Sequence, residues 1–447
     1  MRRNIALLAC LIFGVLSACD RGPDAYEKLT DGVLVRVGGE QAKAVRLKVV
    51  ADRVIRVTAF PGAGTDLPAS LAAVRTGDAN VTFDVRENRG NVVLKTAALS
   101  AEVSRATGRV VFRDAKGAEL LREVDGGRSF QPVEVDGKSF HAIRQQFESP
   151  GDEAGYGLGQ HQHRQMNYKG ENVELAQHNM DIGIPFVLSS RNYGVLWDNT
   201  SITRFGDPRP WQPISTALNL YDAEGKPGGL TATYFVDGKP RLTRVESDLD
   251  YQYIRSVTEN YPPELKDIAK QKVVWEGRIE AKAPGTHRFT LYASDYHKLW
   301  IDGALVFDEW RQNWNPWYRN FELEMVPGKP RAIRIEWDRN GGYLALQHRD
   351  PMPEEERGRL SFFSELGHAI DYYFIAGNDA DEVIAGYRLV TGKAVLLPRW
   401  VYGFWQSRER YKTQDELVGA VREYRKRGIA LDNIVQDWFY WKEDSWG

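Results

Sequence analysis

A single aspartate, Asp437, stands among aromatic residues at the end of the last apolar run in the sequence. A similar cluster, in which Trp405 precedes the polar residues 406–408, follows an earlier apolar run over residues 400–405. Carboxylates accept hydrogen bonds from hydroxyl groups, and aromatic rings cover apolar faces. This combination of residue types is typical of a carbohydrate site, so Asp437, Trp438 and Trp405 are candidate substrate-binding residues.

The residues between these clusters predict the elements that bring them together. The apolar runs at 400–405 and 432–435 predict buried strands. Thr413 followed by Glu416 is a capping box that begins a helix, and Gly428 ends it. One helix face is expected to be buried because it is apolar at helical spacing, at Leu417, Ala420, Val421 and Tyr424. Strand, helix and strand with short joints make a parallel βαβ unit, whose chemistry lies beyond the carboxyl ends of its strands.

The stretch Gln436-Asp437-Trp438-Phe439-Tyr440-Trp441 resembles the second barrel strand of glycoside hydrolase family 31. This family holds α-glucosidases, α-xylosidases and relatives, with a (β/α)₈ catalytic barrel. By this resemblance Asp437 binds hydroxyls of the sugar in subsite −1 and is not the nucleophile. The family's nucleophile and acid/base are Asp residues after the fourth and sixth strands, which we expect beyond Gly447. The resemblance therefore implies the N-terminal portion of a retaining glycosidase, inactive by itself.

The composition describes a globular chain of 447 residues, 42% hydrophobic and 27% charged, with a net charge of −2. This length is enough for roughly three domains. The near-neutral charge implies no basic face, so we expect no nucleic-acid partner.

The first 19 residues predict a bacterial lipoprotein signal peptide. Two arginines precede an apolar stretch from Ile5 to Leu16, and Leu16-Ser17-Ala18-Cys19 resembles the lipoprotein box. The resemblance implies a lipid on Cys19 that anchors a secreted protein in a membrane, facing the periplasm or the cell surface. The alternative is an ordinary signal peptide with a chance cysteine. Residues 20–30 are polar and are expected to form a tether.

Residues 31–225 predict the first part of an antiparallel β-sandwich. Apolar and polar residues alternate at period two from Val45 to Val57, and turn residues separate further runs of this kind up to Phe147. The turn Gly155–His161 resembles the Tyr-Gly-Leu-Gly-(Glu/Gln)-His turn of family 31, whose N-terminal domain is a galactose-mutarotase-like sandwich.

The resemblance also implies that the loop over residues 172–186 reaches toward the barrel mouth. Gln177 and Asn179 in this loop are candidate substrate contacts, and a plain surface loop is the alternative. His161 and His163 are two residues apart, but a third metal ligand is missing nearby. We therefore expect neither a metal nor a cofactor.

Residues 226–357 predict an inserted β-sandwich, and the preceding stretch DAEGKPGG at 222–229 predicts a linker. Its Gly-Leu-x-x-x-Tyr-Phe start, its Trp-x-Gly strand and its Leu-Trp-Ile-Asp-Gly hairpin resemble the protective-antigen-type domain. Such domains often bind glycans. Calcium-dependent relatives use two adjacent Asp residues, whereas this chain has Asp295 followed by Tyr296.

Three tryptophans, Trp310, Trp314 and Trp317, cluster in the stretch EWRQNWNPWYRN of this inserted domain. Exposed rings would form a platform on which sugars stack, and inward packing into a core is the alternative. After the insertion, residues 358–379 resemble the last strand of the first sandwich. Residues 380–447 then begin the barrel with a helix from Ala380 to Leu389.

The expected fold is therefore mostly β: a galactose-mutarotase-like sandwich with an inserted sandwich, followed by the start of a (β/α)₈ barrel. A lipoprotein with such an insertion resembles the α-xylosidases that act on xyloglucan oligosaccharides. Bulky rings such as Trp438 or Tyr440 would close the pocket where glucose carries its hydroxymethyl group. An α-glucosidase of the same family and a non-catalytic glycan-binding surface lipoprotein remain alternatives.

Overall fold

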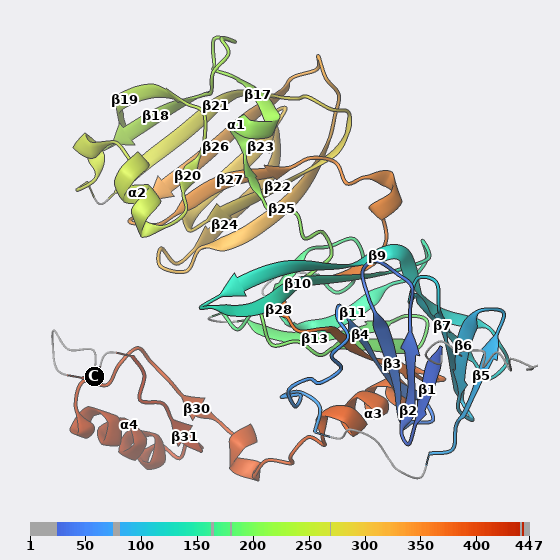
Figure 1. Cartoon of the computed structure of the whole chain (residues 1–447). Coiled ribbons are helices and arrows are strands. Elements are labelled where there is room, and N and C mark those ends of the chain that lie inside the picture. Colours follow the sequence, from blue (N-terminus) through green and yellow to red (C-terminus); the bar gives the residue numbers. More distant parts are fainter. Residues whose placement is uncertain are drawn as a thin grey trace, which may run out of the picture. The chain divides into compact units, whose positions relative to one another are not determined.

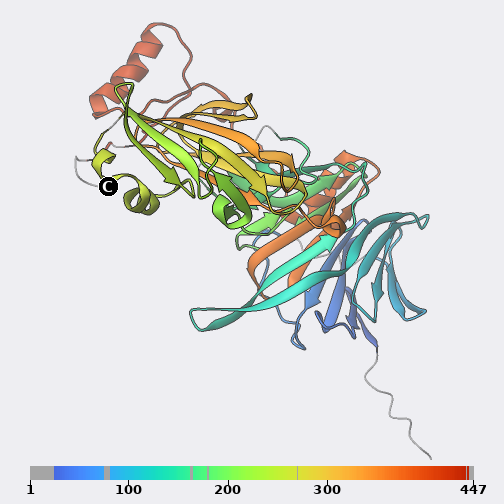
Figure 2. The same cartoon turned by 90° about the horizontal axis from the view of Figure 1, so that it is seen from above.

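The computed structural model describes residues 25–74, 81–161, 165–178, 181–268, 270–438 and 440–441. The chain divides into two compact units. The smaller unit comprises Tyr387–Gly447 with Ala72–Arg75, and the larger unit comprises the remainder. In the larger unit, two β-sandwiches follow from the predicted alternation of apolar and polar residues (Figures 1 and 2).

The first sheet of the N-terminal sandwich has eight described strands in the order β1-β2-β3-β4-β29-β14-β13-β11. Their bounds are β1 Tyr26–Leu29, β2 Gly32–Arg36, β3 Ala44–Ala51, β4 Val54–Phe60, β29 Ile370–Ala376, β14 Tyr193–Trp197, β13 Ile182–Ser189 and β11 Gly155–Gln160. The predicted turn at Asp52 and Arg53 joins β3 to β4 in antiparallel register.

The second sheet has nine described strands in the order β12-β15-β28-β10-β9-β8-β7-β6-β5. Their bounds are β12 Val173–Leu175, β15 Thr203–Phe205, β28 Leu360–Gly367, β10 Lys138–Phe147, β9 Glu119–Val135, β8 Val110–Asp114, β7 Leu99–Ser104, β6 Asn91–Lys95 and β5 Asp84–Asn88. Aromatic rings of the two sheets meet in the core, where Phe112 stacks on Phe374 with ring centroids 4.0 Å apart.

The predicted return of residues 358–379 to this sandwich is confirmed, and it supplies two strands instead of one. β28 joins the second sheet beside β10, and β29 enters the first sheet between β4 and β14. All seven residues of β29 are buried. The residues between β15 and β28 are thus an insertion whose two ends return to one sandwich.

The inserted sandwich has a sheet with the order β16-β27-β22-β25, in which β20 also pairs with β27, and a sheet with the order β19-β18-β21-β26-β23-β24, in which β17 also pairs with β21. The bounds are β16 Gln212–Pro213, β17 Leu218–Tyr221, β18 Leu230–Val236, β19 Lys239–Glu246, β20 Asp250–Tyr251, β21 Gln271–Ala281, β22 Gly285–Ala293, β23 Asp295–Ile301, β24 Ala304–Arg311, β25 Trp317–Met325, β26 Arg331–Arg339 and β27 Leu344–Arg349. Short helices accompany them: α1 Ile214–Ala217, α2 Ile254–Asn260, η1 Pro263–Leu265 and η2 Glu354–Glu356.

The core of this sandwich contains Trp275, Trp337 and Tyr251, with the two indole rings 6.3 Å apart. The predicted hairpin turn at Asp302 and Gly303 joins β23 to β24, and both residues have positive φ, as a two-residue hairpin requires.

The structure adds two strands to the insertion before its predicted start at residue 226. β16 and β17 precede it, yet they pair with β27 and β21 of the inserted sheets. The predicted linker at 222–229 is a turn within the inserted sandwich, where Tyr221 bridges to Pro227. A stretch rich in glycine marks a turn, but only strand pairing assigns that turn to one domain or to a boundary.

The C-terminal part contains α3 Ala380–Thr391, η3 Arg399–Tyr402, β30 Trp405–Gln406, α4 Gln414–Lys426 and β31 Asn433–Ile434. β30 and β31 pair in parallel, so the predicted βαβ unit is confirmed. Thr413 caps α4 by accepting a hydrogen bond from the backbone N–H of Glu416, and Gly428 ends it with a φ of 66°. Within the described residues, no helix is both long and apolar enough to span a membrane.

Two expectations about this part need correction. The predicted buried strand over 400–405 is a 3₁₀ helix, η3, followed by the two-residue strand β30. Leu417 and its partners on the apolar face of α4 are half-buried, and the helix has no buried residue. The side chains of a parallel strand are buried when other elements cover both faces of its sheet, and β30 pairs only with β31 among the described strands.

Candidate functional site

The carboxyl ends of β30 and β31 meet, as the sequence predicts. The parallel register pairs Trp405 with Asn433 and Gln406 with Ile434. Tyr411 ties the two ends together: its hydroxyl accepts a hydrogen bond from the Gln406 amide at 3.2 Å, and its carbonyl accepts one from the Gln436 amide at 3.1 Å.

Asp437 lies just beyond this junction and is half-buried. Its Oδ1 accepts a hydrogen bond from the backbone N–H of Trp438 at 2.6 Å. The other carboxylate oxygen, Oδ2, makes no hydrogen bond within the described residues. One hydrogen bond holds this carboxylate in place and leaves most of its lone pairs free. The carboxylate can therefore accept hydrogen bonds from two neighbouring hydroxyl groups of a sugar.

The two candidate aromatic residues differ in their positions. Trp438 is 48% exposed, and its ring stands at 83° to that of Trp441 with centroids 5.1 Å apart. Trp405 is 46% exposed, and its indole N–H donates to the carbonyl of Val401. The ladder pairs Trp405 with Asn433, four positions before Asp437. Trp405 therefore belongs to the carboxyl end of β30, and Trp438 follows the carboxyl end of β31 together with the aspartate.

Gln177 lies between β12 and β13 in the larger unit. Its amide donates to the carbonyl of Gly183 at 2.8 Å and accepts from the N–H of the same residue at 3.3 Å. These two hydrogen bonds close the loop, so the amide already has a structural role. Asn179, the other candidate in this loop, lies outside the described residues.

A cavity of about 620 Å³ lies in the larger unit, between loops of the N-terminal sandwich and one side of the inserted sandwich. Aromatic residues of the insertion line it together with polar residues of both sandwiches: Trp211, Tyr253, Tyr292, Trp314, Trp317, Tyr318, Asn172, Asp181, Arg204, Asp207, Gln252 and Gln347. Burial raises the pKa of Tyr292 to about 12, so this phenol stays a neutral hydrogen-bond donor. Rings with neutral and charged hydrogen-bonding groups around them suit a polyhydroxylated ligand.

The predicted tryptophan platform is divided by the structure. Trp314 is 63% exposed and lines the cavity, whereas Trp310 is 59% exposed and lies opposite Tyr296 on the β23–β24 ribbon. Trp317 departs from the prediction because only 8% of it is exposed, and the guanidinium of Arg311 lies 5.7 Å from the centre of its ring. Successive side chains of a strand point to opposite faces, and in β25 Trp317 lies on the same face as the buried Met325.

Asp295, which stands at the calcium position of the related domains, has a structural role here. Its Oδ2 accepts hydrogen bonds from the N–H groups of Asn340 at 2.6 Å and Gly342 at 2.9 Å. A Cβ atom on Gly342 would lie 2.4 Å from the same oxygen, so the loop needs glycine there. The carboxylate thus holds the turn between β26 and β27.

One cluster that could hold a metal was missed by the sequence analysis. It consists of His287, His348 and Asp350. His287 and His348 are fully buried, 61 positions apart, and only the pairing of β22 with β27 brings them together. Burial, followed by the proximity of His287 and Arg209, lowers the pKa of His348 to about 3. No short motif marks these residues, so only a prediction of strand pairing could have found them.

The fold and the βαβ junction define a class of protein: two β-sandwiches, one inserted in the other, followed by the first part of a parallel α/β domain. Residues 44–205 match the glycosyl hydrolase 31 N-terminal galactose mutarotase-like domain. Residues 225–356 match the PA14 domain, and residues 394–447 match the glycosyl hydrolases family 31 TIM-barrel domain. The chain therefore carries the N-terminal domain and the start of the barrel domain of glycoside hydrolase family 31, with an inserted PA14 domain.

Solved and curated relatives agree with this assignment. The crystal structure of a family 31 α-xylosidase from Xanthomonas citri superimposes with a TM-score of 0.89 at 52% identity, over 94% of this chain and 46% of the other. An α-xylosidase from Saccharolobus solfataricus is 24% identical over 90% of this chain and 35% of its own length. A soil-metagenome α-xylosidase complexed with xylose shares the fold, with a TM-score of 0.54 at 18% identity, over 93% of this chain and 42% of the other. The chain spans less than half the length of each of these relatives.

Proposed function

We propose that this chain is the N-terminal part of a retaining α-xylosidase that acts on xyloglucan oligosaccharides. The observation that carries the proposal is the βαβ junction, where Asp437 lies beyond the carboxyl end of β31 and accepts a hydrogen bond from the backbone N–H of Trp438. The 52% identity to the Xanthomonas citri α-xylosidase supports xylose as the preferred sugar over glucose.

In this proposal Asp437 binds sugar hydroxyls and performs no covalent step. A retaining glycosidase needs two further carboxyl groups about 5–5.5 Å apart, one that attacks the anomeric carbon and one that protonates the leaving oxygen. By the family resemblance these follow the fourth and sixth barrel strands, whereas β30 and β31 are the first and second. We therefore propose that residues 1–447 alone hydrolyse no glycoside.

The preference for xylose would come from steric exclusion near Asp437. Glucose differs from xylose by a hydroxymethyl group on C5, and a bulky side chain in that space rejects the larger sugar. Trp438 and Tyr440 lie one and three positions after Asp437 and are 48% and 57% exposed, so they are the candidate side chains. One methylene-sized difference gives about 10- to 200-fold discrimination in an apolar pocket.

The test of the site is Asp437→Asn in the protein purified from its native source. The variant keeps the size of the side chain but accepts fewer hydrogen bonds, so kcat/KM for an aryl α-xyloside should fall about 10- to 100-fold, the value of one or two hydrogen bonds to a charged group. Asp415→Asn, on the exposed first turn of α4, is the matched control and should leave kcat/KM unchanged. Equal activity of both variants would remove Asp437 from the sugar site.

The cavity of the larger unit is proposed to be a separate binding site for a xyloglucan oligosaccharide. Trp314 lines it and is 63% exposed, so it offers a ring face for stacking. Trp314→Ala should weaken binding of a xyloglucan oligosaccharide about tenfold in calorimetric titrations, because one exposed aromatic contact contributes about 1–2 kcal/mol. Trp310→Ala, which removes an equally exposed ring outside the cavity, is the control and should leave the affinity unchanged.

The cavity also supports a second candidate function, a surface lipoprotein that binds glycans without cleaving them. Under this alternative the natively purified protein binds the oligosaccharide, and Trp314→Ala abolishes binding, but no reducing sugar is released. An α-glucosidase of the same family would release glucose faster than xylose.

We further propose that Cys19, outside the described residues, carries a lipid that anchors the protein in a membrane. The support is the sequence Leu16-Ser17-Ala18-Cys19 after an apolar stretch. Metabolic labelling with a radioactive fatty acid should mark the wild type and leave Cys19→Ala unlabelled. Label retained by the variant, or absent from the wild type, would contradict the proposal.

A further inference from the structure

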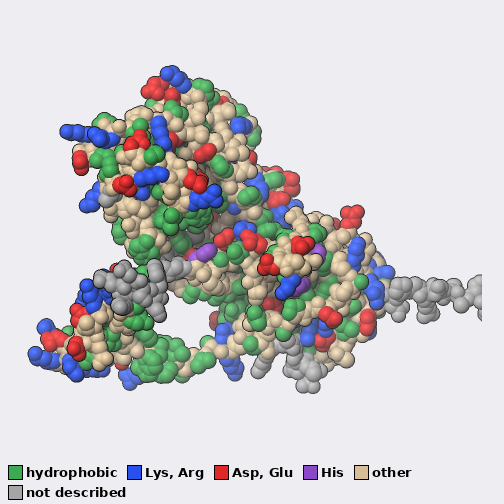
Figure 3. Space-filling model, turned by 60° about the vertical axis from the view of Figure 1, so that its left-hand side comes forward, with side chains coloured by type: hydrophobic (Ala, Val, Ile, Leu, Met, Phe, Trp, Pro, Cys, Tyr) green, Lys and Arg blue, Asp and Glu red, His purple; other side chains and the backbone are tan. Residues whose placement is uncertain are grey.

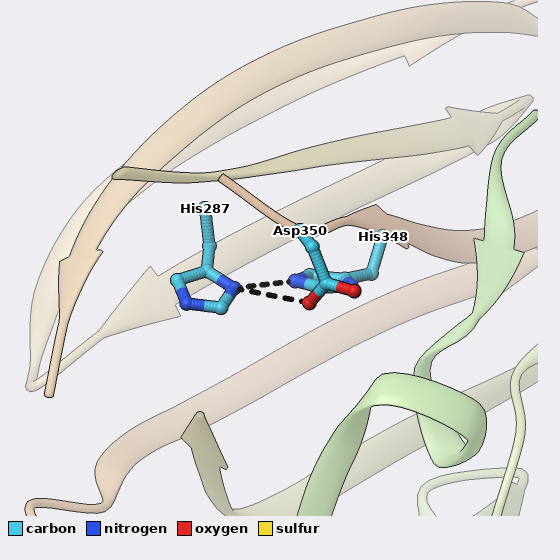
Figure 4. Close-up of side chains that lie close together, drawn as sticks. All are labelled: His287, His348 and Asp350. Carbon is cyan, nitrogen blue, oxygen red and sulfur yellow. Dashed lines mark hydrogen bonds and ion pairs between the residues drawn. The ribbon is translucent and has the colours of Figure 1, made fainter. Parts of the chain in front are cut away.

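Three potential metal ligands converge at one end of the inserted sandwich. The ladder pairs Phe289 with His348 and Arg288 with Arg349, so continuing it places Asp350 opposite His287 on the same face. Figure 4 shows the three side chains facing one another at this end of β22 and β27. His287 Nδ1 lies 2.8 Å from His348 Nε2 and 4.0 Å from a carboxylate oxygen of Asp350.

The hydrogen bonds determine which nitrogen of His287 has a lone pair. Nε2 of His287 lies 2.8 Å from the carbonyl oxygen of Ala283, which can only accept, so Nε2 carries the proton. Nδ1 therefore presents its lone pair to His348 and Asp350. Ligating histidines characteristically donate their other N–H to a carbonyl or carboxylate in this way, which fixes the ring for coordination.

His348 can present a lone pair to the same point. In the absence of an ion its Nε2 donates to Nδ1 of His287, while its own Nδ1 is buried without a hydrogen-bond partner among the described residues. Moving the proton from Nε2 to Nδ1 therefore breaks only the hydrogen bond between the two histidines. An ion bound between the rings replaces that hydrogen bond with two coordinate bonds.

The distances suit a small tetrahedral ion. Nitrogen and oxygen ligands about 2.0–2.2 Å from a tetrahedral ion lie roughly 3.3–3.5 Å from one another. The measured separations of 2.8 and 4.0 Å bracket this value, and all three ligand atoms lie within 4.8 Å of one another. Shifts of about half an ångström would complete the site: the two imidazole rings would move apart, and Asp350, whose side chain is 52% exposed, would move toward them.

The charges around the cluster also permit a cation. Arg209 is a guanidinium whose charge acts on His348, and it is paired with Asp207 at 2.6 Å. Arg288 is paired with Glu322 at 2.8 Å. Arg349 lies over the ring of Trp211 and donates to the carbonyl of Asp207. Asp350 contributes a negative charge that directly faces His287.

We propose that His287, His348 and Asp350 form a binding site for a divalent first-row transition-metal ion of the zinc class. Imidazole nitrogens prefer such ions, whereas calcium and magnesium prefer oxygen ligands. Three protein ligands leave the fourth position for a water molecule or another small ligand. The ion would join β22 to the segment that leaves the inserted domain after β27, so its role is to hold this exit in place.

The test uses the whole chain without a histidine tag, freed of metal by a chelator. Titration with zinc chloride against a chromogenic zinc indicator at neutral pH should give one bound ion per chain and raise the thermal unfolding midpoint. Calcium and magnesium chloride should do neither. Cobalt chloride should give the strong visible absorption of a four-coordinate site.

Asp350→Ala is the decisive variant because its side chain is half exposed and its loss does not disturb the core. It should weaken zinc binding at least tenfold and abolish the rise in the midpoint. Asp338→Ala, which removes another half-exposed carboxylate from β26 of the same sandwich, should bind zinc like the wild type. His348→Gln should lose the ion altogether, provided its circular dichroism matches that of the wild type.

Two results would overturn the proposal. One is zinc binding that stays below a tenth of an ion per chain in the wild type. The other is zinc binding that Asp350→Ala leaves unchanged, because the ion would then lie at other histidines, such as the exposed His178 beside Glu174. Neither result bears on the glycosidase proposal, which does not involve this cluster.

Discussion

The inserted sandwich and the segment from Tyr387 to Trp441 contain similar aromatic residues but bury them to very different extents. Trp275 and Trp337 of the sandwich are fully buried. Trp400, Trp405 and Trp438 of the C-terminal segment are about half exposed. Figure 3 shows hydrophobic side chains at the surface of this segment, which agrees with the high exposure of Val395 and Leu396.

The difference follows from the number of neighbours that each strand has. β21, which carries Trp275, has β18 and β26 on its two sides, and β30 has only β31 among the described strands. A parallel strand is normally covered on both faces, so its apolar residues are chosen for that environment. The aromatic residues of the two regions therefore have different roles. Those of the inserted sandwich stabilise its core, whereas those of the C-terminal segment are available for other contacts.

The largest effect is expected in the inserted core. Trp275→Ala should reduce the free energy of unfolding of the larger unit by about 3–5 kcal/mol, because it opens a cavity and leaves Glu246 without the indole donor at 2.7 Å. Urea unfolding followed by circular dichroism measures this change. A loss below about 1 kcal/mol would mean that the sandwich core is loosely packed, and the comparison would fail.

An intermediate effect is expected for the ion pair between Asp207 and Arg209. Burial alone would raise the pKa of Asp207, but hydrogen bonds from the side chain and backbone of Arg209 outweigh it and hold the pKa below the usual 3.8. The stability that this pair supplies is therefore complete above pH 3.8 and is lost as the pH falls through the lower, folded-state pKa.

Asp207→Asn should reduce stability at pH 7 by about 1–3 kcal/mol and flatten the fall in unfolding midpoint below pH 3.8. Glu423→Gln in α4 is the comparison from the other region. It breaks a pair with Arg427 whose side chains are 47% and 67% exposed, and exposed pairs contribute about 0–1 kcal/mol. If the unfolding midpoints of Asp207→Asn and the wild type depended on pH in the same way, the buried pair would not be the cause of the fall in stability below pH 3.8.

The smallest effect is expected for Trp405→Ala in the C-terminal segment. Nearly half of this side chain is already exposed, so its removal from residues 1–447 should change the unfolding free energy by less than about 1 kcal/mol. Thermal unfolding of this variant beside Trp275→Ala gives the comparison directly. A loss as large as that of Trp275→Ala would mean that the ring is a core residue of this segment.

Patterns over a few neighbouring residues correctly predicted the elements that are determined by those residues alone. The capping box at Thr413, the turn at Asp302 and Gly303, and the alternation in β3 and β4 depend on residues a few positions apart. The strand predicted over 400–405 was wrong because an apolar run becomes a strand only beside other strands.

The candidate site shows the same division. Asp437 and Trp438 were predicted as site residues because they are adjacent in the sequence and follow a strand, and their role in sugar binding stays a prediction. Burial of Trp317 and the convergence of His287 with His348 depend on pairing between distant strands, which no local pattern records. The glycine-rich stretch at 222–229 was predicted to be a linker, but the pairing of β17 with β21 makes it a turn of the inserted sandwich.

The central claim is that Asp437 and the rings beside it belong to a site for α-xylosides. The most direct test is the ratio of kcat/KM for an aryl α-xyloside to that for the matching aryl α-glucoside, measured on the protein purified from its native source. We expect a ratio of at least about ten, as exclusion of one hydroxymethyl group predicts. A ratio below one would contradict the account and assign the protein to the α-glucosidases of the family.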